Sequence, residues 1–233
     1  MKNTLAFIPA RGGSKGIPNK NIFPLNGNPL IYYTLDLVKK LDFKVIPFLS
    51  TDSIDIKRYY ESQGFLTDYI RPENLASDTS STIDAVLHGL EWYEKKYNIE
   101  LDSILLLQPT SPIRNPIEVS NALRYFYENN LESLVSVTEM REHPFECIKF
   151  NSNNWEFLEK AEGKVARRQD YINRYFFIDG SFYLVKKDFL YRNNAFVKQA
   201  ETYLYETNLR YSIDIDILED ITVAEAILKR GTI

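Results

Sequence analysis

Residues 4–21 read TLAFIPARGGSKGIPNKN, and they join an apolar, strand-like run to a loop rich in glycine and positive charge. Glycine has no Cβ, so backbone N–H groups can approach an anion closely and form a concave nest of donors. Arg11, Lys15 and Lys20 add charged donors to this loop. In open α/β sheets, ligands bind beyond the carboxyl ends of the strands, where this loop lies. The stretch predicts a polyphosphate site, while a solvated basic turn remains the alternative on these residues alone.

Two familiar phosphate motifs do not account for the loop. Its glycines fall at positions 12, 13 and 16, whereas the dinucleotide fingerprint requires G-x-G-x-x-G. The Walker A string, G-x-x-x-x-G-K-[ST], does not occur in the chain. A different kind of phosphate-binding loop is therefore indicated.

Composition narrows the class of protein. Of the 233 residues, 44% are hydrophobic and 26% are charged, which is typical of a globular protein. The net charge of -4 argues against a general nucleic-acid binder. One cysteine, Cys147, excludes an intramolecular disulfide framework and fits a reducing compartment. No signal peptide or stretch long enough to span a bilayer is visible. We therefore expect a cytoplasmic protein without nucleic-acid or membrane partners.

Strand-like and helix-like patterns alternate along most of the chain, which predicts crossover units. Strands are predicted at 4–10, 44–51, 103–110, 132–140, in the first part of 180–190 and near 212–216. Helices are predicted at 28–41, 53–64, 80–97, 114–130, late in 180–190 and at the C-terminal end. The expected fold class is α/β, with one domain over 1–233 and a mostly parallel, Rossmann-like sheet covered by helices on both faces. The alternation breaks over 141–177, which we interpret as an inserted antiparallel excursion.

Local signals mark several helix ends. Asn28 is expected to cap the helix that follows, with Pro29 at its first position, and Asn115–Pro116 repeats this arrangement. Gly64 is a plausible C-terminal stop. Asp78 and Thr79 are candidates for the N-terminal cap of the helix over 80–97.

Asp214 and Asp216 lie two residues apart in the sequence SIDID. Residues i and i+2 of an extended strand face the same side, so both carboxylates can point at one metal ion. Carboxylate oxygens suit Mg²⁺, which usually shares its shell with water and substrate phosphate. The alternative is that these acids belong to the acidic start of the last helix, an interpretation that explains Glu219 and Asp220 better than the first pair.

The full string IPARGGSKGIPNKN resembles the N-terminal signature of the cytidylyltransferases that activate nine-carbon 2-keto sugar acids, the CMP-sialic acid synthetase family. Other segments of the chain resemble the family in the same order: RPENLASDTSS (71–81), LLLQPTSPIR (105–114), RRQD (167–170), DGSFY (179–183) and SIDIDILED (212–220). The resemblance thus covers nearly the whole chain.

The resemblance implies that CTP and the sugar acid react to give a CMP-sugar and pyrophosphate, with Mg²⁺ as cofactor and a homodimer as the working form. The implied CTP-binding residues are Arg11, Gly12, Gly13, Ser14, Lys15, Gly16, Lys20, Asn21, Arg71 and Ser80. The implied sugar-acid-binding residues are Gln108, Arg168, Gln169 and Asp179, the metal ligands are Asp214 and Asp216, and the catalytic residues are Arg11, Lys20 and Asp216. Aromatic residues of the excursion are expected to reach across the dimer.

Several points stay open at this stage. Many relatives have Asn-Gly-Ala where this chain has Asp179-Gly180-Ser181, so a negative charge stands where the resemblance implies a contact with the sugar or the ribose. The acceptor could be of the sialic, legionaminic or pseudaminic type. A close alternative is a transferase for a shorter 2-keto acid or a sugar phosphate. An alternative of another class is a nucleotide-binding module without catalysis.

Overall fold

The sheet at the centre of the fold has six strands. The computed structural model describes residues 2–151, 154–159, 173–208 and 212–230. The strands follow the spatial order β10-β6-β9-β5-β1-β4, and their bounds are β1 (Thr4–Pro9), β4 (Ile46–Ser50), β5 (Ser103–Leu106), β6 (Ser133–Glu139), β9 (Phe176–Lys186) and β10 (Thr202–Glu206). Strand β1 pairs in parallel with β4 and β5, and β10 pairs in parallel with β6. Strand β9 runs antiparallel to both neighbours. The predicted mostly parallel sheet is confirmed.

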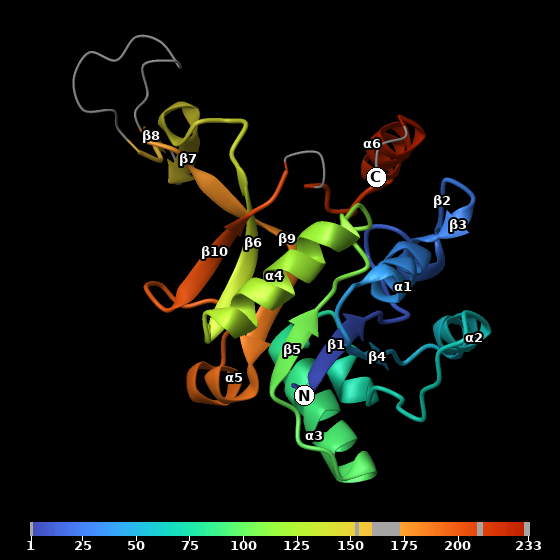
Figure 1. The fold of residues 1–233 in the computed structure, drawn as a ribbon. Coiled ribbons are helices and arrows are strands. Elements are labelled where there is room, and N and C mark those ends of the chain that lie inside the picture. Colours follow the sequence, from blue (N-terminus) through green and yellow to red (C-terminus); the bar gives the residue numbers. More distant parts are fainter. Residues whose placement is uncertain (1, 152–153, 160–172, 209–211, 231–233) are drawn as a thin grey trace.

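Helices cover both faces of this sheet, as the alternation predicted (Figure 1). They are α1 (Leu30–Lys40), α2 (Ile54–Ser62), α3 (Thr82–Tyr97), α4 (Pro116–Glu128), α5 (Lys187–Asn193) and α6 (Leu218–Lys229). Successive strand residues point to opposite faces. Accordingly Ala6 and Ile8 pack in the core beneath α1, α2 and α4. Leu5 and Phe7 pack in a second core beneath α3 and α5.

A third apolar cluster lies under the glycine-rich loop. Residues of helix α6 pack there with Ile17, Ile113 and Ile215. This packing brings the C-terminal part of the chain against the loop that follows β1. No described helix is long and apolar enough to cross a membrane.

Two of the predicted helix ends are confirmed. The side chain of Asn115 accepts a hydrogen bond from the backbone N–H of Ile117, and Pro116 is the first residue of α4. Gly64 follows α2 with a φ of +85°, a left-handed conformation that suits glycine at a helix C-terminus.

The predicted Asn28 cap is wrong. Helix α1 begins one residue later than expected, at Leu30, and has no side-chain cap. Residues Asn28–Pro29 instead form β3, which pairs with β2 (Pro24–Leu25). Asn26 and Gly27 both have positive φ, and an Asn-Gly pair with positive φ favours a tight hairpin turn. The hairpin therefore takes Asn28 into strand pairing and away from the helix.

The C-terminal strand predicted near 212–216 is also wrong. The described residues 212–216 belong to no strand of the sheet and to no helix. The strand in this part of the chain is β10, whose residues Thr202–Glu206 pair with β6. Extended backbone becomes a strand only where a partner is available, which local sequence does not determine.

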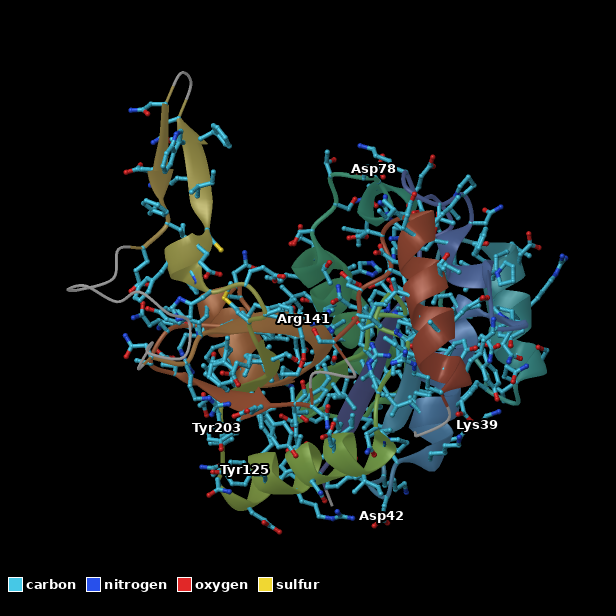
Figure 2. All side chains as sticks on the ribbon, turned by 90° about the horizontal axis from the view of Figure 1, so that it is seen from above. Lys39, Asp42, Asp78, Tyr125, Arg141 and Tyr203 are labelled. Atoms are coloured by element: carbon cyan, nitrogen blue, oxygen red, sulfur yellow. The ribbon has the colours of Figure 1, made fainter. Side chains whose placement is uncertain are left out.

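The segment after β6 contains a separate hairpin. A short 3-10 turn, η3 (Pro144–Glu146), leads into β7 (Ile148–Asn151), which pairs antiparallel with β8 (Asn154–Phe157). The hairpin stands away from the main body (Figure 2). The chain then re-enters the central sheet at Phe176, the first residue of β9.

Candidate active site

A cavity of about 260 Å³ lies where β1, β4 and β5 end. This edge is the usual ligand-binding position of an open α/β sheet. The cavity brings together many of the residues predicted to bind substrates: Arg11, Gly13, Ser14, Lys20, Asn21, Arg71, Ser80 and Gln108. The glycine-rich loop supplies one wall, and the segment from Leu75 to Ala85 contributes to another.

Other predicted residues take different positions. Gly12, Lys15 and Gly16 belong to the loop but do not line the cavity. Asp214 and Asp216 lie beside it on the segment before α6, where both are exposed. Asp179 is buried. Arg168 and Gln169 lie outside the described residues.

Internal hydrogen bonds set the shape of the loop. The backbone N–H of Gly12 donates to Oδ1 of Asp52 at 2.8 Å, and Nδ2 of Asn21 donates to the carbonyl of Arg11 at 2.9 Å. The amide of Gly12 is therefore already engaged by a carboxylate, and Asn21 acts as a brace for the loop. A Cβ on Gly13 would have no heavy atom within 4 Å, so the backbone is open to the cavity at that position.

Asp78 neutralises the outer cations of the loop. Its Oδ1 accepts a hydrogen bond from Nη1 of Arg11 at 2.6 Å, and its Oδ2 lies 3.2 Å from Nζ of Lys15. The hydrogen bond from Arg11, followed by that from Lys15, holds the pKa of Asp78 below its usual value. Two cations that share one carboxylate in this way can equally hold the oxygens of a phosphate group.

The predicted capping role for Asp78 and Thr79 is wrong. The cap of α3 is Ser81, whose Oγ accepts from the backbone N–H of Ile83 at 3.1 Å. Three residues before this cap, Ser77, Asp78 and Ser80, line the cavity instead. A short hydroxyl network runs there, with Oγ of Ser77 and Oγ of Ser80 separated by 2.7 Å.

Arg71 contacts Ser50, the last residue of β4, and is almost completely buried. Its Nε donates to Oγ of Ser50 at 2.9 Å, and its Nη2 donates to the carbonyl of Ser50 at 2.6 Å. Burial lowers the pKa of Arg71, and arginine remains charged at neutral pH because its ordinary pKa is so high. A fixed positive charge thus lines the cavity at this point.

Lys20 connects the loop to the paired aspartates. Its Nζ donates to the carbonyl of Ile215 at 2.7 Å and to Oδ1 of Asp216 at 2.8 Å. The lysine side chain is 12% exposed, while that of Asp216 is 74% exposed. Buried Ile215 separates exposed Asp214 from exposed Asp216, so the predicted alternation is present without strand pairing.

The carboxylates of Asp214 and Asp216 suit a cation that takes its remaining ligands from water and substrate. Within the part of the chain that the structure describes, no three His, Cys, Asp or Glu side chains are grouped closely enough to hold a metal ion. Asp214 and Asp216 could supply oxygen ligands from the protein, and Mg²⁺ usually completes its shell with water and substrate phosphate. The residues present therefore fit such an ion.

Asp179 has a set of partners within the protein. Its carboxylate accepts hydrogen bonds from Oγ of Ser136 at 2.5 Å and from Oγ1 of Thr138 and of Thr207, each at 2.7 Å. It also accepts the backbone N–H of Ser181 at 2.9 Å. An ionised carboxylate has about four acceptor sites, so these donors engage it fully. The pairing of β6 with β9 shifts register here.

Sequence reasoning assigned no site role to Asp78 or Arg114, although both lie inside quoted motifs. The guanidinium of Arg114 contacts the carbonyls of Gln108 and Ser181. A single acidic or basic residue in the loop before a helix gives no local sign of such contacts. Only the spacing within LLLQPTSPIR, where a charged residue ends an otherwise apolar or small run, hinted at a buried role.

Comparison with known proteins agrees with this geometry. Residues 5–230 match the family model described as cytidylyltransferase. The chain belongs to this cytidylyltransferase family. Like the series of motif resemblances from residue 8 to residue 220, the match covers nearly the whole length of the chain.

Curated relatives of this cytidylyltransferase include three that differ in name and in coverage. The CMP-N,N'-diacetyllegionaminic acid synthase of Legionella pneumophila is 32% identical over 97% of the chain and 96% of its own length. The pseudaminic acid cytidylyltransferase of Campylobacter jejuni is 29% identical over 98% of the chain and 97% of its own length. The N-acylneuraminate cytidylyltransferase of Streptococcus agalactiae is 29% identical over 93% of the chain. The chain spans about half, 51%, of this last protein.

Solved structures give the same fold. A CMP:2-keto-3-deoxy-manno-octonic acid synthetase complexed with CTP matches with a TM-score of 0.70 at 15% identity, covering 98% of this chain and 99% of that chain. At this level of identity the likeness concerns the fold alone.

Proposed function

We propose that this cytidylyltransferase transfers CMP from CTP to a nine-carbon 2-keto sugar acid of the sialic, legionaminic or pseudaminic type, with release of pyrophosphate. The observation that carries the proposal is one cavity in which Arg11, Lys20 and Arg71 converge beside Gln108. Three cations fit a triphosphate, and the amide of Gln108 fits a hydroxylated acceptor. The named activities of the curated relatives support the same reaction.

The chain's own residues would act mainly by positioning and by neutralising charge. The acceptor hydroxyl gives its proton to solvent as its oxygen forms a bond to the α-phosphorus. The bond to the pyrophosphate oxygen breaks, and negative charge grows on the leaving group. Arg11 and Lys20, which both line the cavity, would bind these oxygens, and fixed donors that meet developing charge lower the barrier most. Arg168 and Gln169, which lie outside the described residues, are proposed from the family resemblance to hold the acceptor.

We propose Mg²⁺ as the cofactor, held by Asp214 and Asp216 together with substrate oxygens. When bound, the ion supplies charge neutralisation at the phosphate groups. The proposal is supported by the exposure of both carboxylates beside the cavity and by the contact of Asp216 with Lys20. Lys20 would then keep Asp216 oriented while its own charge faces the triphosphate. The single cysteine of the chain supports work in a reducing, cytoplasmic compartment.

The reaction is tested by incubating the purified protein with CTP and MgCl₂ and measuring pyrophosphate. The acceptors are N-acetylneuraminic acid, diacetyllegionaminic acid, pseudaminic acid and 2-keto-3-deoxy-manno-octonic acid. We expect pyrophosphate only when a nine-carbon acid is present, and none in excess EDTA. Full turnover in excess EDTA would overturn the cation requirement. Turnover restricted to the eight-carbon acid would favour the shorter-acid alternative, and CTP binding without turnover would favour the non-catalytic module.

We also propose a homodimer in which the β7–β8 hairpin contacts the second copy. Large apolar side chains are exposed on this hairpin, including Phe150, Trp155 and Phe157. An isolated two-stranded hairpin buries little surface of its own and is marginally stable in water. Its apolar residues would be buried by a partner hairpin in an isologous contact, the commonest arrangement in soluble oligomers.

Replacing Phe150 by serine is expected to shift the protein from dimer to monomer in size-exclusion chromatography with light scattering. Phe150 is 76% exposed on the hairpin, and Leu66, which is 88% exposed on the main body, provides the matched control. Leu66→Ser should leave the mass unchanged. A wild-type protein that runs as a monomer at micromolar concentration would refute the proposed dimer, and a Phe150→Ser protein that stays dimeric would refute the hairpin interface.

A further inference from the structure

The side chain of Arg114 is buried, and its guanidinium contacts three separate parts of the fold. It is 5% exposed. Its Nε donates to the carbonyl of Ser181 at 2.5 Å, its Nη1 donates to Oγ1 of Thr34 at 3.1 Å, and its Nη2 donates to the carbonyl of Gln108. Thr34 belongs to α1, Ser181 to β9, and Gln108 to the loop after β5. One side chain thus joins a helix, a strand and a substrate-facing loop.

The contact with Gln108 falls at the turn that presents this residue to the cavity. The carbonyl of Gln108 also accepts the backbone N–H of Ser111 at 3.1 Å, and Oγ of Ser111 donates to the carbonyl of Gly180 at 3.2 Å. Gly180 has a φ of +72°, and a Cβ there would come within 3.5 Å of Oε1 of Gln108. The amide of Gln108 therefore lies against the backbone of β9 that Arg114 also binds.

The same loop continues to the paired aspartates. The carbonyl of Thr110 accepts the backbone N–H of Ile215 at 2.7 Å, and the carbonyl of Ile215 accepts Nζ of Lys20 at 2.7 Å. Ile215 is the buried residue between Asp214 and Asp216. Two hydrogen bonds, joined by the backbone of residues 108–110, consequently connect Arg114 to the segment that carries both carboxylates.

The positive charge of Arg114 interacts with two carboxylates of the protein, Asp179 and Asp214. Burial lowers the pKa of Arg114, and the negative charges of Asp179 and Asp214 act in the opposite direction. A planar guanidinium offers five N–H donors in a fixed geometry, whereas a lysine ammonium offers three donors around one point. Lysine could supply the charge but could not reach Thr34, Ser181 and Gln108 in their three directions.

We propose that Arg114 is a positioning residue for the acceptor half of the reaction, which fixes Gln108 and, through Thr110 and Ile215, the paired aspartates. The inference rests on the proposed function for the identity of the reaction. The direct partners of Arg114 are Ser181, Thr34 and Gln108. Among the described contacts, Arg114 is linked to Lys20 only indirectly, through Thr110 and Ile215. Loss of Arg114 should therefore impair turnover of the bound substrates more than capture of CTP.

The test compares Arg114→Lys with Arg124→Lys, a matched exposed arginine on α4 whose contacts are to Asn121 and Asp42. For Arg114→Lys we expect kcat with the sugar acid to fall by about tenfold or more, because small displacements of positioned groups are costly. The Kd for CTP, measured calorimetrically, should change by less than about threefold. Hydrogen exchange at the amides of Ser111 and Ile215 should become faster. Arg124→Lys should match the wild type in every measurement.

Two outcomes would overturn the proposal. One is an Arg114→Lys protein that keeps the wild-type kcat and amide protection. The other is a loss of CTP affinity in proportion to the loss of kcat. If Arg114→Lys fails to fold, Thr34→Val decides, because it removes one contact of Arg114 and keeps the charge. Thr34→Val should lower kcat by about threefold with unchanged CTP affinity, and an unaltered kcat would refute the role.

These results are separable from the proposed function. The wild-type protein is assayed first with CTP and each acceptor, and a lack of turnover with all of them would refute the proposed function by itself. In that case the exchange rates of the Ser111 and Ile215 amides still decide whether Arg114 positions this loop.

Discussion

Asp216→Asn is expected to lower kcat by a hundredfold or more while the protein remains folded. The substitution removes one of two proposed metal-ligand carboxylates and also the negative partner of Lys20, whose Nζ lies 2.8 Å from Oδ1 of Asp216. Loss of charge neutralisation of this kind costs several kcal/mol at the transition state, and about 1.4 kcal/mol corresponds to a tenfold change in rate. The fold should survive because the Asp216 side chain is 74% exposed.

The measurement is steady-state pyrophosphate release as a function of MgCl₂ concentration, with thermal unfolding as the check on folding. We expect a higher Mg²⁺ requirement as well as a lower kcat. Glu219→Gln is the matched control, since it removes an exposed carboxylate from the same acidic run at the start of α6. It should change kcat by less than about threefold, as surface charges usually contribute little. A variant Asp216→Asn with wild-type kcat and Mg²⁺ dependence would refute the metal assignment.

Gly16→Ala is expected to reduce activity by about a hundredfold for a steric reason. A Cβ on Gly16 would lie 2.2 Å from the backbone carbonyl oxygen of Asp216. Because both atoms belong to backbone-anchored groups, either the loop or the aspartate segment must move. A displacement of about 1 Å at a catalytic site can cost a hundredfold in rate, and overpacking of this kind typically costs about 1–3 kcal/mol in stability.

Thermal unfolding and pyrophosphate release measure the two effects of Gly16→Ala. Gly13→Ala is the control for stability, because a Cβ at Gly13 would meet no atom within 4 Å. Gly13→Ala should therefore unfold at the wild-type temperature, whereas Gly16→Ala should unfold several degrees lower. Equal unfolding temperatures for both variants, with Gly16→Ala fully active, would contradict the close approach of the loop and the aspartate segment.

The features that could be predicted from sequence are those set by local chemistry. The loop after β1 was predicted to bind anions from its glycines and cations, and the structure places Arg11 and Lys20 at one cavity. The Asn115–Pro116 cap depends only on neighbouring backbone groups and was also predicted correctly. Alternation of strands and helices was enough to predict the mostly parallel sheet.

The features that were missed depend on distant partners. Residues 212–216 form no strand, and the strand of this part of the chain is β10, which pairs with β6. Asn28 pairs with Leu25 in a hairpin, and this pairing competes with helix capping. Two of the contacts of Arg114 join residues far apart in the sequence, Ser181 at a separation of 67 and Thr34 at 80. A pattern in one segment carries no information about such contacts until the fold is known.

The position of β9 has a consequence for how the chain folds. The described sheet consists of a β4-β1-β5 half and a β6-β10 half, and β9 is the strand that pairs with both β5 and β6. Pairings between segments so far apart in sequence raise the contact order and slow folding. During synthesis from the N-terminus, β5 and β6 keep bare edges until residues 176–186 have left the ribosome. Nascent chains that pause before this point carry unprotected edges on β5 and β6, the kind of surface on which chains pair with one another and aggregate.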